Sequence, residues 1–204
     1  MRDPFHPKSW LGLLTEVVLI GLSVFLALLA DQWRVHKEHR QEAEATLRYI
    51  REEVMVNRDA VNKERPYHEK LSQEIGRFLE SDGPKTRQAF EATVHFTGVH
   101  PVTFERTAWD LALANQSLSY LNPSLAYAIS RVYSRQQAFQ TLENSFLQSA
   151  FAASTFATQD ATGLASAILV YLGDVNSQEP ALLQIYEQLL RQLDSSSQTQ
   201  SPPQ

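Results

Sequence analysis

The chain contains no cysteine and few glycines, and both shortages limit what it can be. Without cysteine among its 204 residues, it can form no disulfide, no thiolate-bound zinc or iron–sulfur site and no thiol nucleophile. Seven glycines leave little for phosphate-binding loops, and no G-x-x-x-x-G-K-[ST], G-x-G-x-x-G or G-x-S-x-G pattern occurs. We therefore expect neither an enzyme nor a bound cofactor.

Basic residues do not predominate, since 18 Lys and Arg face 23 Asp and Glu. A nucleic-acid partner is not expected, because such proteins usually carry a basic face and a high pI. The six histidines form neither H-E-x-x-H nor Glu-x-x-His, the usual motifs of zinc and di-iron sites. His36, His39 and Glu42 could share one face of a helix, but their segment is so charged that we expect them to be solvated. No metal site is predicted.

One long apolar run, from Trp10 to Ala30, is interrupted only by Thr15, Glu16 and Ser23. At helical rise such a run spans about 30 Å, the thickness of a bilayer core, so we predict a transmembrane helix over 10–30 after a short flank at 1–9. A buried core helix rarely needs this length. A cleaved signal peptide has a shorter apolar region, and cleavage after Ala30 would place Leu28 at a position that favours a small residue.

Positive charges on the two sides of this run are nearly balanced, so orientation is weakly specified. Arg2 and Lys8 precede it, and Arg34, Lys37 and Arg40 follow it. The later chain has few basic residues and no cysteine, which favours export of the C-terminal domain.

Glu16 lies about 9 Å along the helix from Trp10, near the expected interface. An ionisable residue within a membrane segment is a candidate functional group. Three roles are open: an interfacial residue that sets register, an interhelical hydrogen bond in an oligomer, or an ion pathway. The first is favoured, because a single span offers no partner group.

A charged segment without proline or glycine follows the span, and it predicts a stalk helix over 31–65. Its apolar positions recur every three or four residues, as in a coiled coil. The repeat comprises Trp33, His36, Arg40, Ala43, Leu47, Ile50, Val54, Asn57 and Val61. Two interpretations are open: Leu47, Ile50 and Val54 pack on later helices of the same chain, or they form an intermolecular seam. Small residues such as Ser23 and Ala27 would allow close helix approach within the membrane.

The run TEVVLIGLSVFLALLADQW resembles the N-terminal signature of an uncharacterised family of bacterial single-pass membrane proteins. Glu16, Ala27, Leu28, Asp31 and Trp33 match that signature, whereas Ser23 stands where the family usually has glycine. A second segment, RTAWDLALANQSLSYLNPSLAYAISRVY, is similar to the family's Thr-Ala-aromatic segment. The resemblance implies a bacterial inner-membrane protein, and it implies no activity.

The rest of the chain predicts an all-α bundle over 66–194 and a disordered polar tail over 195–204. Breaks at Ser81–Pro84, Thr97–Pro101 and Asn115–Ser117 separate helices expected near 86–94, 103–114, 123–156, 161–172 and 181–193. A short strand pair over 93–104 is a weaker alternative. Arg106, Trp109 and Asp110 could frame a ligand pocket between helices, although a core tryptophan with a locally paired aspartate is the commoner arrangement.

These observations favour a membrane-anchored helical module that binds another membrane protein or a second copy of itself. A ligand sensor with a pocket near Trp109 is the alternative, and a membrane enzyme is a weaker one.

Overall fold

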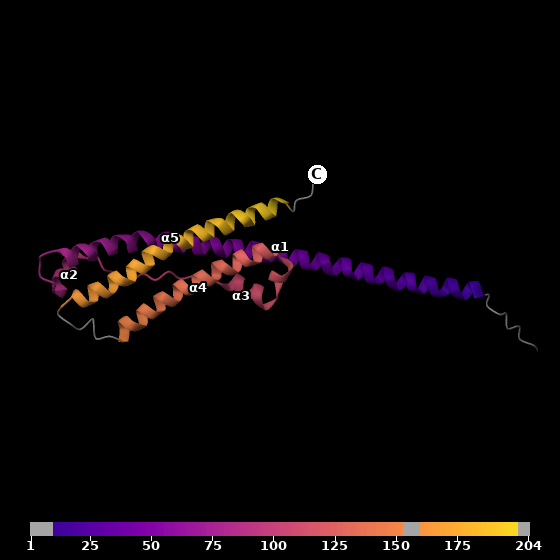
Figure 1. The fold of residues 1–204 in the computed structure, drawn as a ribbon, viewed down its shortest axis with the longest axis horizontal. Helices are drawn as coiled ribbons and strands as arrows, with labels where there is room; N and C mark the ends of the chain where they lie inside the picture. The colour runs from indigo at the N-terminus through magenta and orange to yellow at the C-terminus, as the bar shows by residue number, and fades with distance from the viewer. Residues whose placement is uncertain (1–9, 153–159, 200–204) are drawn as a thin grey trace, which may run out of the picture. The chain divides into compact units, whose positions relative to one another are not determined.

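The computed structural model describes residues 10–152 and 160–199, and within these residues the protein is helical and contains no strand (Figure 1). The all-α fold expected from the sequence, a long N-terminal apolar helix leading into a helical bundle, is confirmed. In chain order the elements are α1 (Trp10–Glu80), α2 (Arg87–Thr93), α3 (Thr107–Ala114), the 3₁₀ helix η1 (Ser117–Tyr120), α4 (Pro123–Ala152) and α5 (Thr162–Thr199).

The chain divides into two compact units, one before and one after the junction of Ala45 with Thr46. We refer to Met1–Ala45 as unit 1 and to Thr46–Gln204 as unit 2. The predicted boundary between stalk and bundle was Pro66, twenty residues further along the chain. The difference arises because the helix already contributes buried side chains such as Ile50 and Val54 to unit 2.

Unit 1 contains the first part of α1, which is helical throughout its described residues. An 18-residue window that begins at Leu14 has a mean hydropathy of 2.1, and none of it is buried. This is the one helix in the described part of the chain that is long and apolar enough to cross a membrane. The large apolar side chains of this window are all exposed, including Val17 at 68% and Phe25 at 57%.

Unit 2 is a bundle of α4, α5 and the part of α1 from Thr46 onward. Helices α4 and α5 contact one another and run in opposite directions (Figure 1). Amphipathic spacing places one apolar stripe of each helix in a shared core. The fully or almost fully buried apolar side chains include Ile50, Val54, Val61, Leu71, Ile75, Ile129, Phe139, Ile168, Leu172, Tyr186 and Leu189.

Helix α1 continues through Pro66, where the sequence predicted its end, and stops at Glu80 before the Ser81–Pro84 break. A proline inside a helix removes one backbone hydrogen bond, that of its own nitrogen to the carbonyl four residues earlier. Pro66 and Asn62 are both exposed, so water can solvate the freed carbonyl of Asn62. Packing of the flanking turns then outweighs the local preference.

Helix α5 likewise continues through Gly173 and Pro180, both exposed, although these residues predicted two separate helices. It extends to Thr199, so the expected disordered tail is helical over 195–199, and residues 200–204 lie outside the described part. The expected helix over 123–156 is described as far as Ala152.

Between α2 and α3 the chain has no regular structure from Val94 to Arg106, and we call this segment the strap. The alternative of a strand pair over 93–104 is wrong, because the strap bonds to side chains rather than to another strand. Its turn requires a left-handed backbone at Gly98 (φ 125°), a conformation that other residues adopt only with strain, and His100 also has a positive φ of 45°.

Candidate functional site

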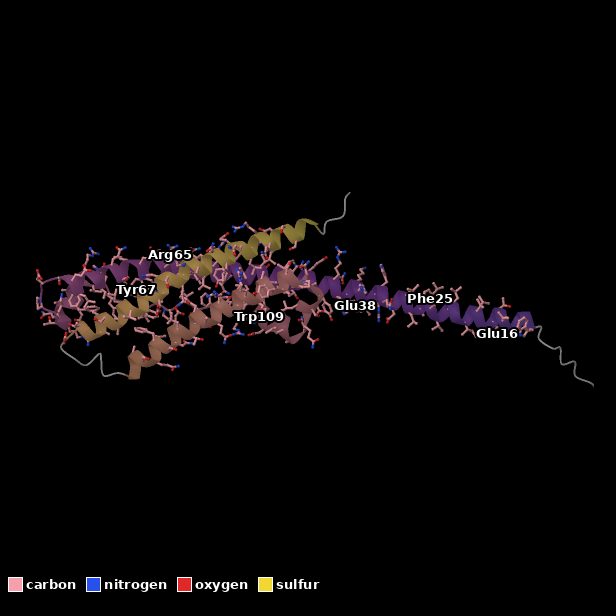
Figure 2. All side chains as sticks on the ribbon, viewed as in Figure 1. Glu16, Phe25, Glu38, Arg65, Tyr67 and Trp109 are labelled. Carbon is pink, nitrogen blue, oxygen red and sulfur yellow. The ribbon has the colours of Figure 1, made fainter. Side chains whose placement is uncertain are left out.

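The polar candidates of the predicted membrane segment lie exposed on α1 in unit 1. Figure 2 shows Glu16 and Phe25 projecting from this helix. Ser23 Oγ donates to the carbonyl of Leu19 at 2.7 Å, so its hydroxyl is satisfied within its own helix. Ser23 and Ala27, four residues apart, therefore present small, exposed surface on one face of the helix.

The residues of the predicted seam are divided between core and surface. Ile50 and Val54 are fully buried in unit 2 of a single chain, and Leu47 is half-buried. The self-packing interpretation therefore describes Ile50 and Val54, which cannot reach a second molecule unless the bundle opens.

Arg106, Trp109 and Asp110 lie at the N-terminal end of α3. Arg106 and Asp110 are exposed and pair with each other at 3.0 Å. Trp109, labelled in Figure 2, is half-buried and stacks on Tyr133 of α4, with ring centroids 4.7 Å apart. The tryptophan is thus packed against α4, and the charged pair lies on the surface beside it.

Glu53 of α1, which no sequence pattern singles out, contacts both α3 and α4. It is only 5% exposed, and its carboxylate accepts hydrogen bonds from the Ala108 amide at 2.7 Å and from the Tyr133 hydroxyl at 2.6 Å. Because Arg106 provides no side-chain cap, Glu53 serves as the cap of α3, where a negative charge is favourable. Burial and the nearby Glu53 carboxylate together raise the pKa of Tyr133.

His68 and Glu179 form an ion pair at the centre of the bundle, and both side chains are completely buried. His68 Nδ1 lies 2.7 Å from Glu179 Oε1, and its Nε2 lies 3.0 Å from the carbonyl oxygen of Val99 and 3.1 Å from that of His100. All three neighbours can accept hydrogen bonds, so a protonated ring, which has a donor on each nitrogen, satisfies every one of these contacts. Burial alone would lower the pKa of His68, but the bond and attraction to Glu179 outweigh it and the pKa is raised.

A second buried carboxylate, that of Glu143 on α4, lies close enough to this pair to interact with both its charges. It is 2% exposed, and its Oε1 accepts a hydrogen bond from the Val102 amide of the strap at 2.8 Å. Burial raises the pKa of Glu143 to about 7, and the Val102 amide and His68 only partly offset this. Tyr171 of α5 interacts electrostatically with Glu143 and Glu179, and burial together with these carboxylates raises its pKa.

The strap is bound chiefly by side chains of α1. Asn57 is completely buried and makes two bonds of 2.7 Å to the backbone of Glu105, one to its carbonyl and one from its amide. Further along α1, Tyr67 donates to the carbonyl of Gly98 at 2.6 Å, and Glu74 accepts from the His95 amide at 2.9 Å. These side chains supply the partners that a strand would have obtained from a sheet.

We call His68, Glu143 and Glu179 the buried acid–histidine cluster. In unit 2, buried polar atoms of Gln136, Asn176, Glu179 and Tyr186 have no hydrogen-bond partner among the residues that the structure describes. Over the same residues, no group of three or more His, Asp or Glu side chains has an arrangement that could hold a metal ion. The cluster can hold a proton near neutral pH and can position the strap, but its groups are shielded from solvent.

No pattern in the sequence separates these buried ionisable residues from surface ones, because Glu and His are usually exposed. The one usable signal is position: Glu53, Asn57 and His68 share the apolar face of α1 with Ile50, Val54 and Leu71.

Comparison of the chain with known protein families, with curated proteins and with solved structures finds no match.

Proposed function

We propose that this protein is a single-pass membrane-anchored helical module that binds another protein, or a second copy of itself, at the membrane. The observation that carries the proposal is the apolar part of α1 in unit 1, where large side chains such as Val17, Ile20 and Leu28 are all about half exposed or more. A contiguous apolar surface of this kind is unfavourable in water and favourable in lipid.

Two other kinds of segment can also be long and apolar, namely a core helix and a signal sequence. A core helix would be buried, whereas none of this window is buried within the chain. A signal peptide has a shorter apolar region than this one. Both points support an uncleaved anchor, and the resemblance of the segment around Glu16 and Trp33 to bacterial single-pass proteins supports the inner membrane as its location.

Association is best assigned to the membrane helix. Ile50 and Val54 are already used in the bundle core of the chain. The face that carries Ser23 and Ala27 has small side chains, and in lipid such faces let two helix backbones approach closely. Since Ser23 already donates to Leu19, it would act there by its small size and not by an interhelical hydrogen bond.

A bundle held at the membrane in this way would gain in local concentration and in orientation towards its partner. The sparse basic charge of the later chain favours an outward-facing bundle. A reporter active on only one side of the membrane, fused after Gln204, measures this orientation directly.

The lack of native cysteine allows a clean test of association. We expect the single-cysteine variants Ser23→Cys and Ala27→Cys, expressed in membranes and oxidised, to give disulfide-linked dimers. Phe25→Cys and Leu29→Cys lie on the opposite face of the same helix and serve as matched controls. Dimers at the first two positions and few at the controls would support a helix interface.

Equal crosslinking at all four positions would indicate random collision and would contradict self-association through this face. If the chain were recovered in the soluble fraction after cell breakage, the anchoring itself would be wrong.

A further inference from the structure

Residues of α4 and α5 line a cavity of about 220 Å³ that opens on the surface of unit 2. We call it the α4–α5 cavity. Neither Trp109 nor any residue of the buried acid–histidine cluster lines it. Its apolar floor includes Val132 and Leu189, each 2% exposed, and its polar rim includes Gln188 and Gln192. One charged side chain, that of Arg131, lines it.

Arg131 has little to hold it in place. Its Nη2 donates to Gln188 Oε1 at 3.4 Å, which is long for a hydrogen bond, and its side chain is exposed. Most of the five donors of the guanidinium are therefore available to a ligand. Arg135, one turn further along the same face of α4, is also exposed and adds a second positive charge.

No carboxylate lines this cavity. The only acidic residue of α4 is Glu143, which is buried in the cluster. In the C-terminal half of α5, Glu187 and Asp194 pair with arginines of α1, at 3.3 Å to Arg58 and 2.9 Å to Arg51. The acidic charge in the C-terminal half of α5 is thus paired with α1, and Arg131 and Arg135 give the α4 side a positive charge.

Such a site suits a small anion that also has an apolar part. Guanidinium groups bind carboxylate and phosphate through paired, charge-assisted hydrogen bonds. The ring of Tyr127, 70% exposed at the mouth of the cavity, offers a flat surface for an apolar or aromatic group. The volume lies below the roughly 300–1,000 Å³ of sites for drug-sized ligands, which limits the ligand to a small molecule or a single headgroup.

We propose that the α4–α5 cavity binds a small organic anion, with its carboxylate or phosphate on Arg131 and its apolar part against Val132 and Leu189. This binding is independent of association through the membrane helix. The anion comes either from solution or from the headgroup of an anionic phospholipid, and the two sources share the same chemistry.

Binding is measured by calorimetric titration of the full chain in a non-ionic detergent, with benzoate and phenyl phosphate as probes. We expect wild type to bind at least one probe, and Arg131→Gln to bind it about tenfold or more weakly, because a charge-assisted bond is lost. Ala128→Leu, which fills the cavity from α4 with an apolar side chain, should abolish binding while leaving the fold intact.

Arg48→Gln is the charge-matched control, because Arg48 is exposed on α1 and lies outside the cavity. Its affinity should equal that of wild type. Equal affinity of the Arg131→Gln and Arg48→Gln variants would show that general positive charge attracts the probe and would overturn the proposal. Failure of wild type to bind either probe would also overturn it.

The same titration in lipid nanodiscs distinguishes the two sources. If the natural ligand is a headgroup, nanodiscs with anionic phospholipid should weaken probe binding relative to zwitterionic ones, and Arg131→Gln should remove the difference. If it is a soluble anion, the two kinds of nanodisc should give the same affinity.

Discussion

His68, Glu143 and Glu179 place three ionisable side chains in the interior of unit 2, where a lone charge would be costly. The pairing of His68 with Glu179 and the hydrogen bonds of His68 to the strap reduce that cost. Replacing both partners of such a pair by apolar residues is often nearly neutral, whereas removing one partner leaves a buried charge and destabilises strongly. We therefore expect the cluster to specify how the strap packs more than to increase stability.

Glu143 makes the stability of unit 2 depend on pH. Folding raises the pKa of Glu143 from 4.5 to about 7, so the folded protein binds this proton more tightly than the unfolded chain does. Its contribution is therefore fully present below pH 4.5 and is lost as the pH rises through about 7. By linkage the loss amounts to about 3 kcal/mol of unfolding free energy. Urea unfolding of the full chain in detergent, at a series of pH values, measures it.

Glu143→Gln should remove this dependence, because glutamine stays neutral and can still accept the Val102 hydrogen bond. The informative window is pH 4.5–6.5. The raised pKa of His68 causes a loss of stability only above its usual value of 6.5, and the lowered pKa values of Glu64 and Glu74 cause one only below 4.5. Asp82→Asn removes an exposed charge as a control and should retain the wild-type slope. A wild-type slope in Glu143→Gln would contradict the assignment.

Among the secondary-structure elements, α1 does two things at once in unit 2: one stripe fills the core, and polar side chains within and beside that stripe bind the strap. Asn57, His68 and Glu74 make these contacts at intervals along the helix, and Glu53 caps α3, which follows the strap. The strap is thereby held in place without joining a helix or a sheet, and the order of polar residues along α1 sets the register of the strap.

Asn57 also binds the strap, and its side chain does not titrate. Its substitution therefore tests the strap contacts independently of pH. We expect Asn57→Ala to lower the unfolding free energy by about 2–3 kcal/mol, since it leaves the amide and the carbonyl of Glu105 without their partner. Hydrogen exchange at the Glu105 amide should accelerate more than exchange in α4. Asn62→Ala, at an exposed position on the same helix, should change neither quantity. Unchanged exchange at Glu105 in Asn57→Ala would contradict the role of the strap contact.

Periodicity was sufficient to predict that α1, α2, α4 and the bundle exist, because apolar spacing and helix formation are local properties. Periodicity could not predict where α1 and α5 end. Pro66, Gly173 and Pro180 break helices by propensity, but packing along the whole helix outweighs that preference. Periodicity could not predict the buried acid–histidine cluster either. His68 meets the strap 31 residues later and Glu179 more than a hundred residues later, and no local pattern reports such contacts.

At the scale of the whole molecule, the two units suit different environments. The large apolar side chains of the candidate span in unit 1 are exposed, an arrangement that favours lipid or detergent, whereas most of the large apolar side chains of unit 2 are buried in their own bundle. The strap contacts, the buried acid–histidine cluster and all the buried core side chains except that of Ala43 lie after Ala45. The apolar window of unit 1, none of which is buried, therefore contributes nothing to this core.

It follows that a fragment spanning residues 46–204 should be soluble without detergent and should unfold cooperatively at nearly the temperature of the full chain. Removing Trp10 and Trp33 leaves Trp109 as the only tryptophan. Its stacking on Tyr133 makes its fluorescence a direct report on the packing of α3 against α4. The full chain, as the matched control, should stay in the membrane pellet after an alkaline wash and enter solution only with detergent. A fragment that aggregates, or whose Trp109 emission is already that of an exposed indole before heating, would mean that the bundle needs its anchor in order to fold.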